Sequence, residues 1–143
     1  MISITFAKPG DFSEVFRLLK ELFTKERFSE RKIKKIFKDD LKSKNSIELL
    51  LKEDDKIIGY GGVKFRNDFQ TQGKIGYLSE LIIDEGCRGK GYGTTFLKEI
   101  MKQAKKKGCG ELQFPSTFKR KKAHAFYAGL GFHKTAYFFW KKI

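Results

Sequence analysis

Residues 78–93 have the sequence LSELIIDEGCRGKGYG, an apolar strand that runs into a loop with glycine at every second position. A helical pattern of apolar residues follows the loop at once. Glycine lets the backbone turn its N–H groups inward and approach a ligand closely. The first amides of a helix lack partners and lie at its positive end, which favours an anion. The stretch therefore predicts a strand–loop–helix unit that binds a phosphate group, to which Arg88 and Lys90 add charge.

Two widespread phosphate loops do not fit this spacing. A P-loop needs Gly-Lys followed by Ser or Thr, whereas Lys90 is followed by Gly91 and Tyr92. A dinucleotide-binding loop needs the pattern G-x-G-x-x-G, whereas Gly89, Gly91 and Gly93 are evenly spaced. The loop is therefore predicted to hold a different phosphate ligand, and the alternative is a flexible turn that binds nothing.

Apolar periodicity predicts the elements on either side of the loop. We expect strands at 2–6, 47–51, 56–65, 74–84, 111–114 and 137–140, and helices at 12–23, 29–41, 94–108 and 123–130. The polar connection at 53–55 predicts a hairpin. The strands at 74–84 and 111–114 are joined by a helix, so they should be parallel neighbours. The fold class is α/β (α+β): a single domain over residues 1–143 with a mixed, mostly antiparallel central sheet flanked by helices on both faces.

Composition narrows the class of protein. Of the 143 residues, 40% are hydrophobic, which is too many for a disordered chain. No run approaches the roughly 20 apolar residues of a membrane span, and Cys87 and Cys109 form neither a CxxC pair nor a metal-ligand cluster. We therefore expect a soluble, cytoplasmic protein with reduced thiols, no membrane partner and no metal. The net charge of +14 attracts anions of any kind and names no ligand.

Two motifs carry a resemblance to a known family. Leu78–Asp84 followed by Arg88–Gly93 closely resembles the cofactor motif, R-x-x-G-x-G, of the Gcn5-related N-acetyltransferase (GNAT) superfamily. Ala123–Tyr127 with Gly131-Phe132 is similar to the A-x-x-F-Y-x-x-x-G-F ending of the same superfamily. The order of elements also agrees, so the likeness covers nearly the whole chain.

The resemblance implies that acetyl-CoA is the acyl-donor cosubstrate, with its pantetheine along the strand and its pyrophosphate in the loop. The implied cofactor-binding residues are Leu81, Ile82, Ile83, Arg88, Gly89, Lys90, Gly91, Tyr92, Gly93, Thr94 and Arg120. Many members carry Asn where this chain has Arg120, which makes it look more like the branch with aminoalkylphosphonate and some aminoglycoside acetyltransferases. Arg120 is expected either to contact the cofactor's phosphates or an anionic substrate, or to be a solvated residue at a helix start.

Acetyl transfer to an amine needs a base, a stabilised oxyanion and an acid. An alkyl amine with a pKa near ~10.4 is protonated at pH 7, so a base must remove its proton. Glu80 is expected on the strand face of Leu78 and Ile82 and resembles the family's general base; the alternative is a strand residue that faces solvent. The resemblance also implies a free backbone N–H at about Ile82 for the oxyanion, where the strand splays. Tyr127 resembles the family's acid for the leaving thiolate, and the alternative is a core aromatic residue.

The sequence thus predicts an enzyme, an N-acetyltransferase that uses acetyl-CoA and acetylates a primary amine of a small molecule or peptide by direct attack. The alternatives are a basic nucleic-acid or ribosome-associated module and a relative that binds CoA without catalysis. A nucleic-acid partner is not expected, because no aromatic-basic recognition motif is present. Acceptor specificity should lie in residues 29–44 and 67–73, which carry no recognisable code, and monomer and homodimer are both left open.

Overall fold

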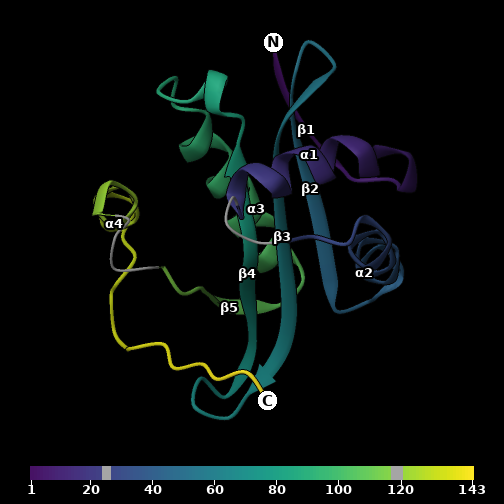
Figure 1. Ribbon diagram of the computed structural model, residues 1–143. Coiled ribbons are helices and arrows are strands. Elements are labelled where there is room, and N and C mark those ends of the chain that lie inside the picture. The colour runs from purple at the N-terminus through teal and green to yellow at the C-terminus, as the bar shows by residue number, and fades with distance from the viewer. Residues whose placement is uncertain (24–26, 117–120) are drawn as a thin grey trace. The chain divides into compact units, whose positions relative to one another are not determined.

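The computed structural model describes residues 1–23, 27–116 and 121–143 (Figure 1). The chain divides into two compact units, residues 1–113 and residues 114–143, each described by itself below. The helices and strands are β1 (Ile2–Phe6), η1 (Pro9–Asp11), α1 (Phe12–Leu22), α2 (Glu30–Lys42), β2 (Ser46–Glu53), β3 (Lys56–Asp68), β4 (Gly73–Ile83), η2 (Glu85–Cys87), α3 (Tyr92–Lys106), β5 (Cys109–Gln113) and α4 (Lys121–Gly129).

The first unit holds a five-stranded sheet in the order β1-β2-β3-β4-β5. All neighbours are antiparallel except β4 and β5, which are parallel, as the crossover through α3 predicted. The predicted hairpin between β2 and β3 is confirmed, and its two turn residues, Asp54 and Asp55, have positive φ angles of 48° and 70°. Such a two-residue turn matches the right-handed twist of the strands that it joins.

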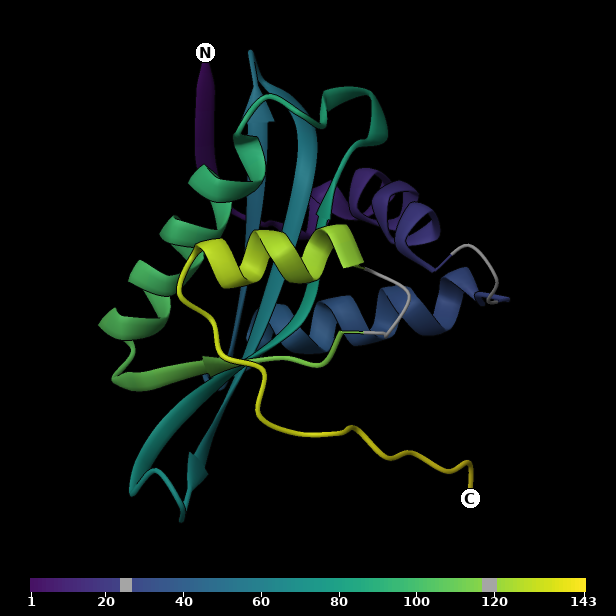
Figure 2. The ribbon, with the colours of Figure 1, turned by 90° about the vertical axis from the view of Figure 1, so that its left-hand side faces the viewer.

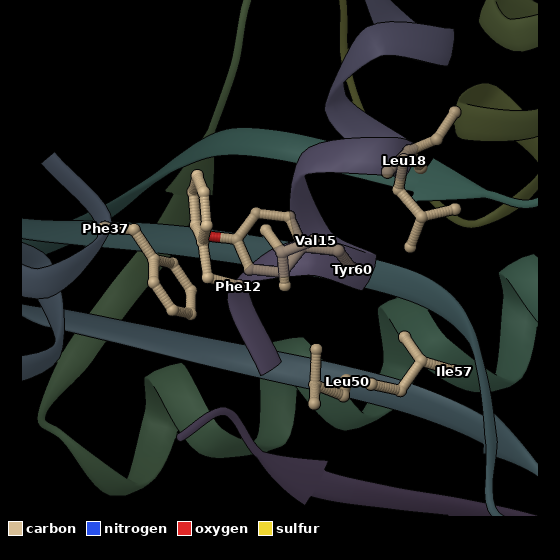
Figure 3. Packing of buried hydrophobic residues seen from close by; sticks show 8 residues of the cluster. Phe12, Val15, Leu18, Phe37, Leu50, Ile57 and Tyr60 are labelled. Carbon is tan, nitrogen blue, oxygen red and sulfur yellow. The ribbon is translucent and has the colours of Figure 1, made fainter. Parts of the chain in front are cut away.

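Helices cover both faces of this sheet, with α3 on one side and α1 and α2 on the other (Figure 2). On the α1–α2 side, Phe12 and Val15 of α1 pack with Phe37 of α2 and with Leu50 and Tyr60 of the sheet (Figure 3). On the α3 side the sheet carries glycine where the helix comes closest. A Cβ added at Gly61 would lie 2.7 Å from Ile100 Cδ1 of α3. The predicted α/β class with a mixed sheet is confirmed.

The described residues of the second unit, 114–116 and 121–143, form α4 and a tail without strands. The strand predicted at residues 137–140 is wrong, since the described residues after Gly131 form no ladder. Phe139 and Trp140 are 90% and 81% exposed. Aromatic residues favour strands only where a neighbouring strand receives their backbone hydrogen bonds, and sequence periodicity cannot supply that neighbour. Across the described residues, no helix combines the length and the apolar character needed to span a bilayer.

Candidate active site

The glycine loop lies between the end of β4 and the start of α3. Gly89 and Gly91 have left-handed φ angles of 81° and 79°, which glycine adopts without strain. Gly91 is the N-cap of α3, so the helix begins at Tyr92, two residues earlier than predicted. The cap has no side chain to accept from the first amides of the helix. These amides are therefore left for a ligand, and a Cβ at Gly89 or Gly91 would meet nothing within 4 Å inside the protein.

An ion pair fixes the start of this loop to α1. Asp84 accepts from the Gly86 amide at 3.1 Å and from Arg17 Nη1 at 3.0 Å. Arg17 also donates to the Ile57 carbonyl oxygen of β3 at 3.3 Å. Burial raises the pKa of Asp84, but the hydrogen bonds from Gly86 and Arg17 outweigh it and hold that pKa below its ordinary value. Asp84 is therefore ionised at neutral pH, and it ties the loop to two neighbouring elements.

Three further contacts position the positively charged side chains and the aromatic ring of the loop. Arg88 Nε donates to the Ile83 carbonyl oxygen at 3.0 Å, which folds the guanidinium back over the end of β4. The Tyr92 hydroxyl donates to the Glu53 carboxylate at the end of β2. The Nζ of Lys90 lies 5.9 Å from the centre of the Tyr92 ring. Free amides, two cations and left-handed glycines together fit a diphosphate group.

β4 leads from the sheet into the loop with one of its edges open. Its pairing with β5 covers only Lys74–Tyr77, and no strand of the described residues pairs with that side of residues 78–83. The Asp84 amide donates to the Ile58 carbonyl oxygen of β3 at 2.7 Å. Alternation along an antiparallel ladder then turns the Ile82 backbone toward β3 and the amides of residues 81 and 83 toward the open edge. The amides that face the open edge, and that could donate to a ligand there, are thus those of residues 81 and 83. The Ile82 amide faces β3.

A β-bulge in β4 decides which way its side chains point. Gly62 of β3 pairs with Glu80 and Val63 pairs with Leu78, so Ser79 is the extra residue. Because one extra residue reverses the alternation of side chains, Glu80 lies on the face of Ile82 but not on that of Leu78. The prediction that all three share a face is therefore wrong. The bulge turns the Glu80 carboxylate toward α1 and α2.

On that side, Glu80 reaches the α1–α2 cavity, a partly open space of about 120 Å³. A Cβ at Gly62 would lie 2.7 Å from Glu80 Oε2, so the glycine makes room for the carboxylate. Burial raises the pKa of Glu80 to about 7; Lys64 opposes the shift, and Asp40 and Glu48 add to it. The cavity is lined by Leu19, Phe23, Phe28, Ile33, Ile36, Phe37, Asp40, Tyr60 and Glu80.

The sequence interpretation missed this cavity and the role of Gly62. Register pairs place Glu48, Gly62 and Glu80 in one row across three strands. Glu48 is only 4% exposed, and burial raises its pKa too. The available signal was the adjacent pair Gly61-Gly62 inside a strand, because glycine there marks a close approach of other groups. That signal does not say which group approaches.

Tyr127 belongs to α4 in the second unit, where it packs among aromatic rings. Its ring centre lies 4.6 Å from that of Phe114, 5.5 Å from that of Phe126 and 6.1 Å from that of Phe132. These contacts fix the ring and leave the role of its hydroxyl a prediction. Arg120 lies outside the described residues. Within the described ranges, no group of three or more His, Cys, Asp or Glu side chains could hold a metal ion.

Comparisons with known proteins agree with this geometry. The chain is 27% identical to thialysine N-epsilon-acetyltransferase of Bos taurus, over 91% of this chain and 83% of that protein. It is 35% identical to the uncharacterized N-acetyltransferase YhdJ of Bacillus subtilis over 68 residues, so the match spans about half the length of each, 47% and 48%. Its fold is similar to that of a predicted acetyltransferase from Clostridium acetobutylicum solved with acetyl-CoA, with a TM-score of 0.84 and 18% identity over 99% and 96% of the two chains.

The family model carries the assignment. The model described as the acetyltransferase (GNAT) family matches residues 12–132, which include α1, the sheet from β2 to β5, the glycine loop and α4. The chain therefore belongs to the acetyltransferase (GNAT) family, and the predicted family and the predicted class of enzyme, an N-acetyltransferase, are confirmed.

Proposed function

We propose that this enzyme takes the acetyl group of acetyl-CoA and transfers it to a primary amine by direct attack. The observation that carries the proposal is the Glu80 carboxylate, whose pKa is raised to about 7 and which is turned by the Ser79 bulge into the α1–α2 cavity. A base with a pKa near the working pH is the group that removes a proton most effectively. The open edge of β4 beside it leads directly to the glycine loop.

The acetyl-CoA cosubstrate is assigned to this edge and loop. The amides at 81 and 83 would pair with the pantetheine arm, as a strand would, because the ladder leaves them without a partner strand. The first amides of α3, with Arg88 and Lys90, would hold the pyrophosphate. The solved relative with acetyl-CoA and the family model support this assignment. Arg120 and Thr94 stay predicted contacts.

The chemistry needs no covalent enzyme. The ammonium form of the amine gives one proton to Glu80, and the freed lone pair forms a bond to the thioester carbon. The nitrogen then releases its second proton to solvent. An amide of the open edge stabilises the oxyanion, since it is fixed before the charge develops. The C–S bond then breaks, and the thiolate takes one proton from Tyr127. The products are an acetylated amine and the CoA thiol, after which solvent returns a proton to Tyr127 and removes one from Glu80.

A thiol-release assay tests the function. Purified protein and acetyl-CoA are incubated with separate amino acids, aminophosphonates, aminoglycosides and short peptides, and free thiol is measured. Release that depends on one amine class supports the proposal. Calorimetric binding of acetyl-CoA with no release by any amine would favour a relative that binds CoA without catalysis. Absence of binding, together with RNA binding that weakens steeply with salt, would favour the nucleic-acid module.

Removing the Tyr127 hydroxyl is expected to slow the reaction and leave the fold intact. Tyr127→Phe keeps the ring that packs against Phe114 and Phe126, so the melting temperature should hold. Loss of an acid typically costs about 10²-fold in kcat. Tyr137→Phe, the same change on an exposed residue, is the matched control. Full kcat in the Tyr127 variant would show that its role is packing alone.

Three finer expectations stay predictions: a single domain over residues 1–143, a cytoplasmic location, and a small molecule or peptide as the source of the amine. Sedimentation of the purified chain would decide between monomer and homodimer.

A further inference from the structure

The lining of the α1–α2 cavity is mostly apolar, with a few polar side chains. Six of its lining side chains carry no polar atom: Leu19, Phe23, Phe28, Ile33, Ile36 and Phe37. The remaining three carry polar atoms. Tyr60 and Glu80 belong to β3 and β4, and Asp40 lies near the end of α2. A ligand that fills this space must therefore place an apolar group against α1 and α2 while its polar group meets Glu80.

Charge limits the ligand further. Among the described residues that line the cavity, Asp40 and Glu80 are the acidic ones. Asp40 is already paired with Lys64, whose Nζ lies 2.6 Å from its Oδ2. One carboxylate is thus left to meet a cation, and a second ammonium group would lie unpaired against apolar side chains. Burial of an unpaired charge is strongly unfavourable, so the cavity selects against polycations.

Size sets the third limit. The cavity volume is about 120 Å³. An apolar cavity of roughly 150 Å³ stays dry and admits one benzene molecule. The space here is therefore suited to a branched alkyl or benzyl group and not to a sugar ring with its hydroxyl groups, which would lose their water on entry.

Resting on the proposed function, we propose that the acetyl acceptor is a small primary amine with one apolar arm of branched-alkyl to benzyl size and no second charge. The arm lies against Phe37 and Ile36, and the amine meets Glu80. Each methylene buried from water should strengthen apparent affinity about fourfold. Amines of this kind should be preferred over diamines, amino alcohols and aminoglycosides.

Matched amine pairs test the proposal with the wild-type protein. Putrescine is butylamine with a second, terminal ammonium group. Ethanolamine has a hydroxyl group where propylamine has its methyl group. The kcat/KM for thiol release should be at least about tenfold higher for the apolar member of each pair, and it should rise from propylamine to isopentylamine and phenethylamine. Putrescine turned over as well as butylamine would overturn the proposal while the acetyltransferase function stands.

A variant pair ties the preference to the cavity. Ile36 lines the cavity and is 54% exposed, so Ile36→Glu adds a carboxylate there with little risk to folding. It should lower kcat/KM for phenethylamine about tenfold or more and raise it for putrescine. Phe6→Glu makes the same charge change on an apolar residue of β1 that is 55% exposed, and it should change neither value. Equal effects of both variants, or none, would overturn the cavity as the acceptor site.

Calorimetry separates this proposal from the one on which it rests. Phenethylamine should bind the wild-type protein saturably, and Ile36→Glu should weaken this binding whereas Phe6→Glu should not. Such binding in a protein that releases no thiol would overturn the transferase function and support the cavity's ligand class. Thiol release with amines that show no dependence on residue 36 would do the reverse.

Discussion

Replacement of Glu80 by glutamine is expected to lower kcat about 10²-fold to 10⁴-fold, the range that a positioned general base supplies. The amide keeps the shape of the side chain but cannot accept the proton of the amine. In the wild type, kcat/KM should rise with pH through about 7, because Glu80 must be deprotonated to act. The variant should lose this limb of the pH profile. An unchanged profile in Glu80→Gln would remove Glu80 from the mechanism.

The same substitution is expected to stabilise the fold at high pH. The pKa of Glu80 is raised from 4.5 to about 7 in the folded protein, so its contribution to stability is present below about pH 4.5 and is lost as pH rises through 7. Glutamine carries no such loss. Above pH 8 the free energy of unfolding of the variant should exceed that of the wild type by on the order of 3 kcal/mol, and near pH 4.5 the two should differ little. Urea unfolding at both pH values measures the difference.

Glu48→Gln is the control for both measurements. Glu48 is also buried with a raised pKa, and it lies in the same cross-strand row, with Gly62 between it and Glu80. Its neutralisation should stabilise the fold at high pH as well. The Glu48→Gln variant should keep the plateau value of kcat. The rising limb of its pH profile should move to lower pH, because the charge of Glu48 contributes to the raised pKa of Glu80. A collapse of kcat in this variant would mean that burial, and not proton transfer, explains the Glu80 result.

Gly91→Leu is expected to weaken acetyl-CoA binding by at least about 100-fold, equivalent to roughly 3 kcal/mol. Gly91 is the left-handed N-cap of α3, and a Cβ there would point into open space where the diphosphate is proposed to lie. The side chain would keep the phosphates from the helix amides. Calorimetric titration with acetyl-CoA measures the loss.

Gly108→Leu separates this effect from backbone strain. Gly108 follows the other end of α3, has a φ of 91°, and would likewise meet nothing within 4 Å of an added Cβ. Either substitution should cost about 1–2 kcal/mol of stability, since a left-handed conformation strains a residue with a Cβ. Only the change at Gly91 should alter affinity. Equal losses of affinity would mean that strain in α3 is sufficient and that the loop does not hold the phosphates.

Local chemistry explains what the sequence could predict. The glycine loop was predictable because alternate glycines and the helix start act within a few residues, and Gly89 and Gly91 have the positive φ angles that require glycine. The turn at Asp54-Asp55 and the parallel pairing of β4 with β5 follow from rules of the same short range or of chain connection. The family follows from the same two short motifs.

The features that the sequence predicted wrongly, or did not predict, depend on neighbours distant in the chain. The period of two placed Leu78 and Glu80 on one face, and the bulge at Ser79 reversed that, since a bulge forms only where β3 and β4 meet. The tail at 137–140 has the composition of a strand without a ladder. The cavity exists because α1 and α2 leave space beside Tyr60 and Glu80 of the sheet, and the periodicity of neither helix predicts this space.

The extra residue in β4 also bears on how such a chain tolerates change in length. Upstream of Ser79 the strand turns Gly76 and Leu78 toward α3, and downstream it turns Glu80 and Ile82 the other way. Loss of Ser79 alone would give a regular ladder in which Leu78 still pairs with Val63 and Glu80 with Gly62, so the side chains on both sides of it would keep their present faces. A regular ladder that kept Ser79 would instead bring Glu80 onto the face of Leu78 and leave a serine opposite Gly62. Removal of the bulged residue should thus be tolerated, whereas removal of a residue from the regular part of β4 would turn the side chains beyond it to the other face.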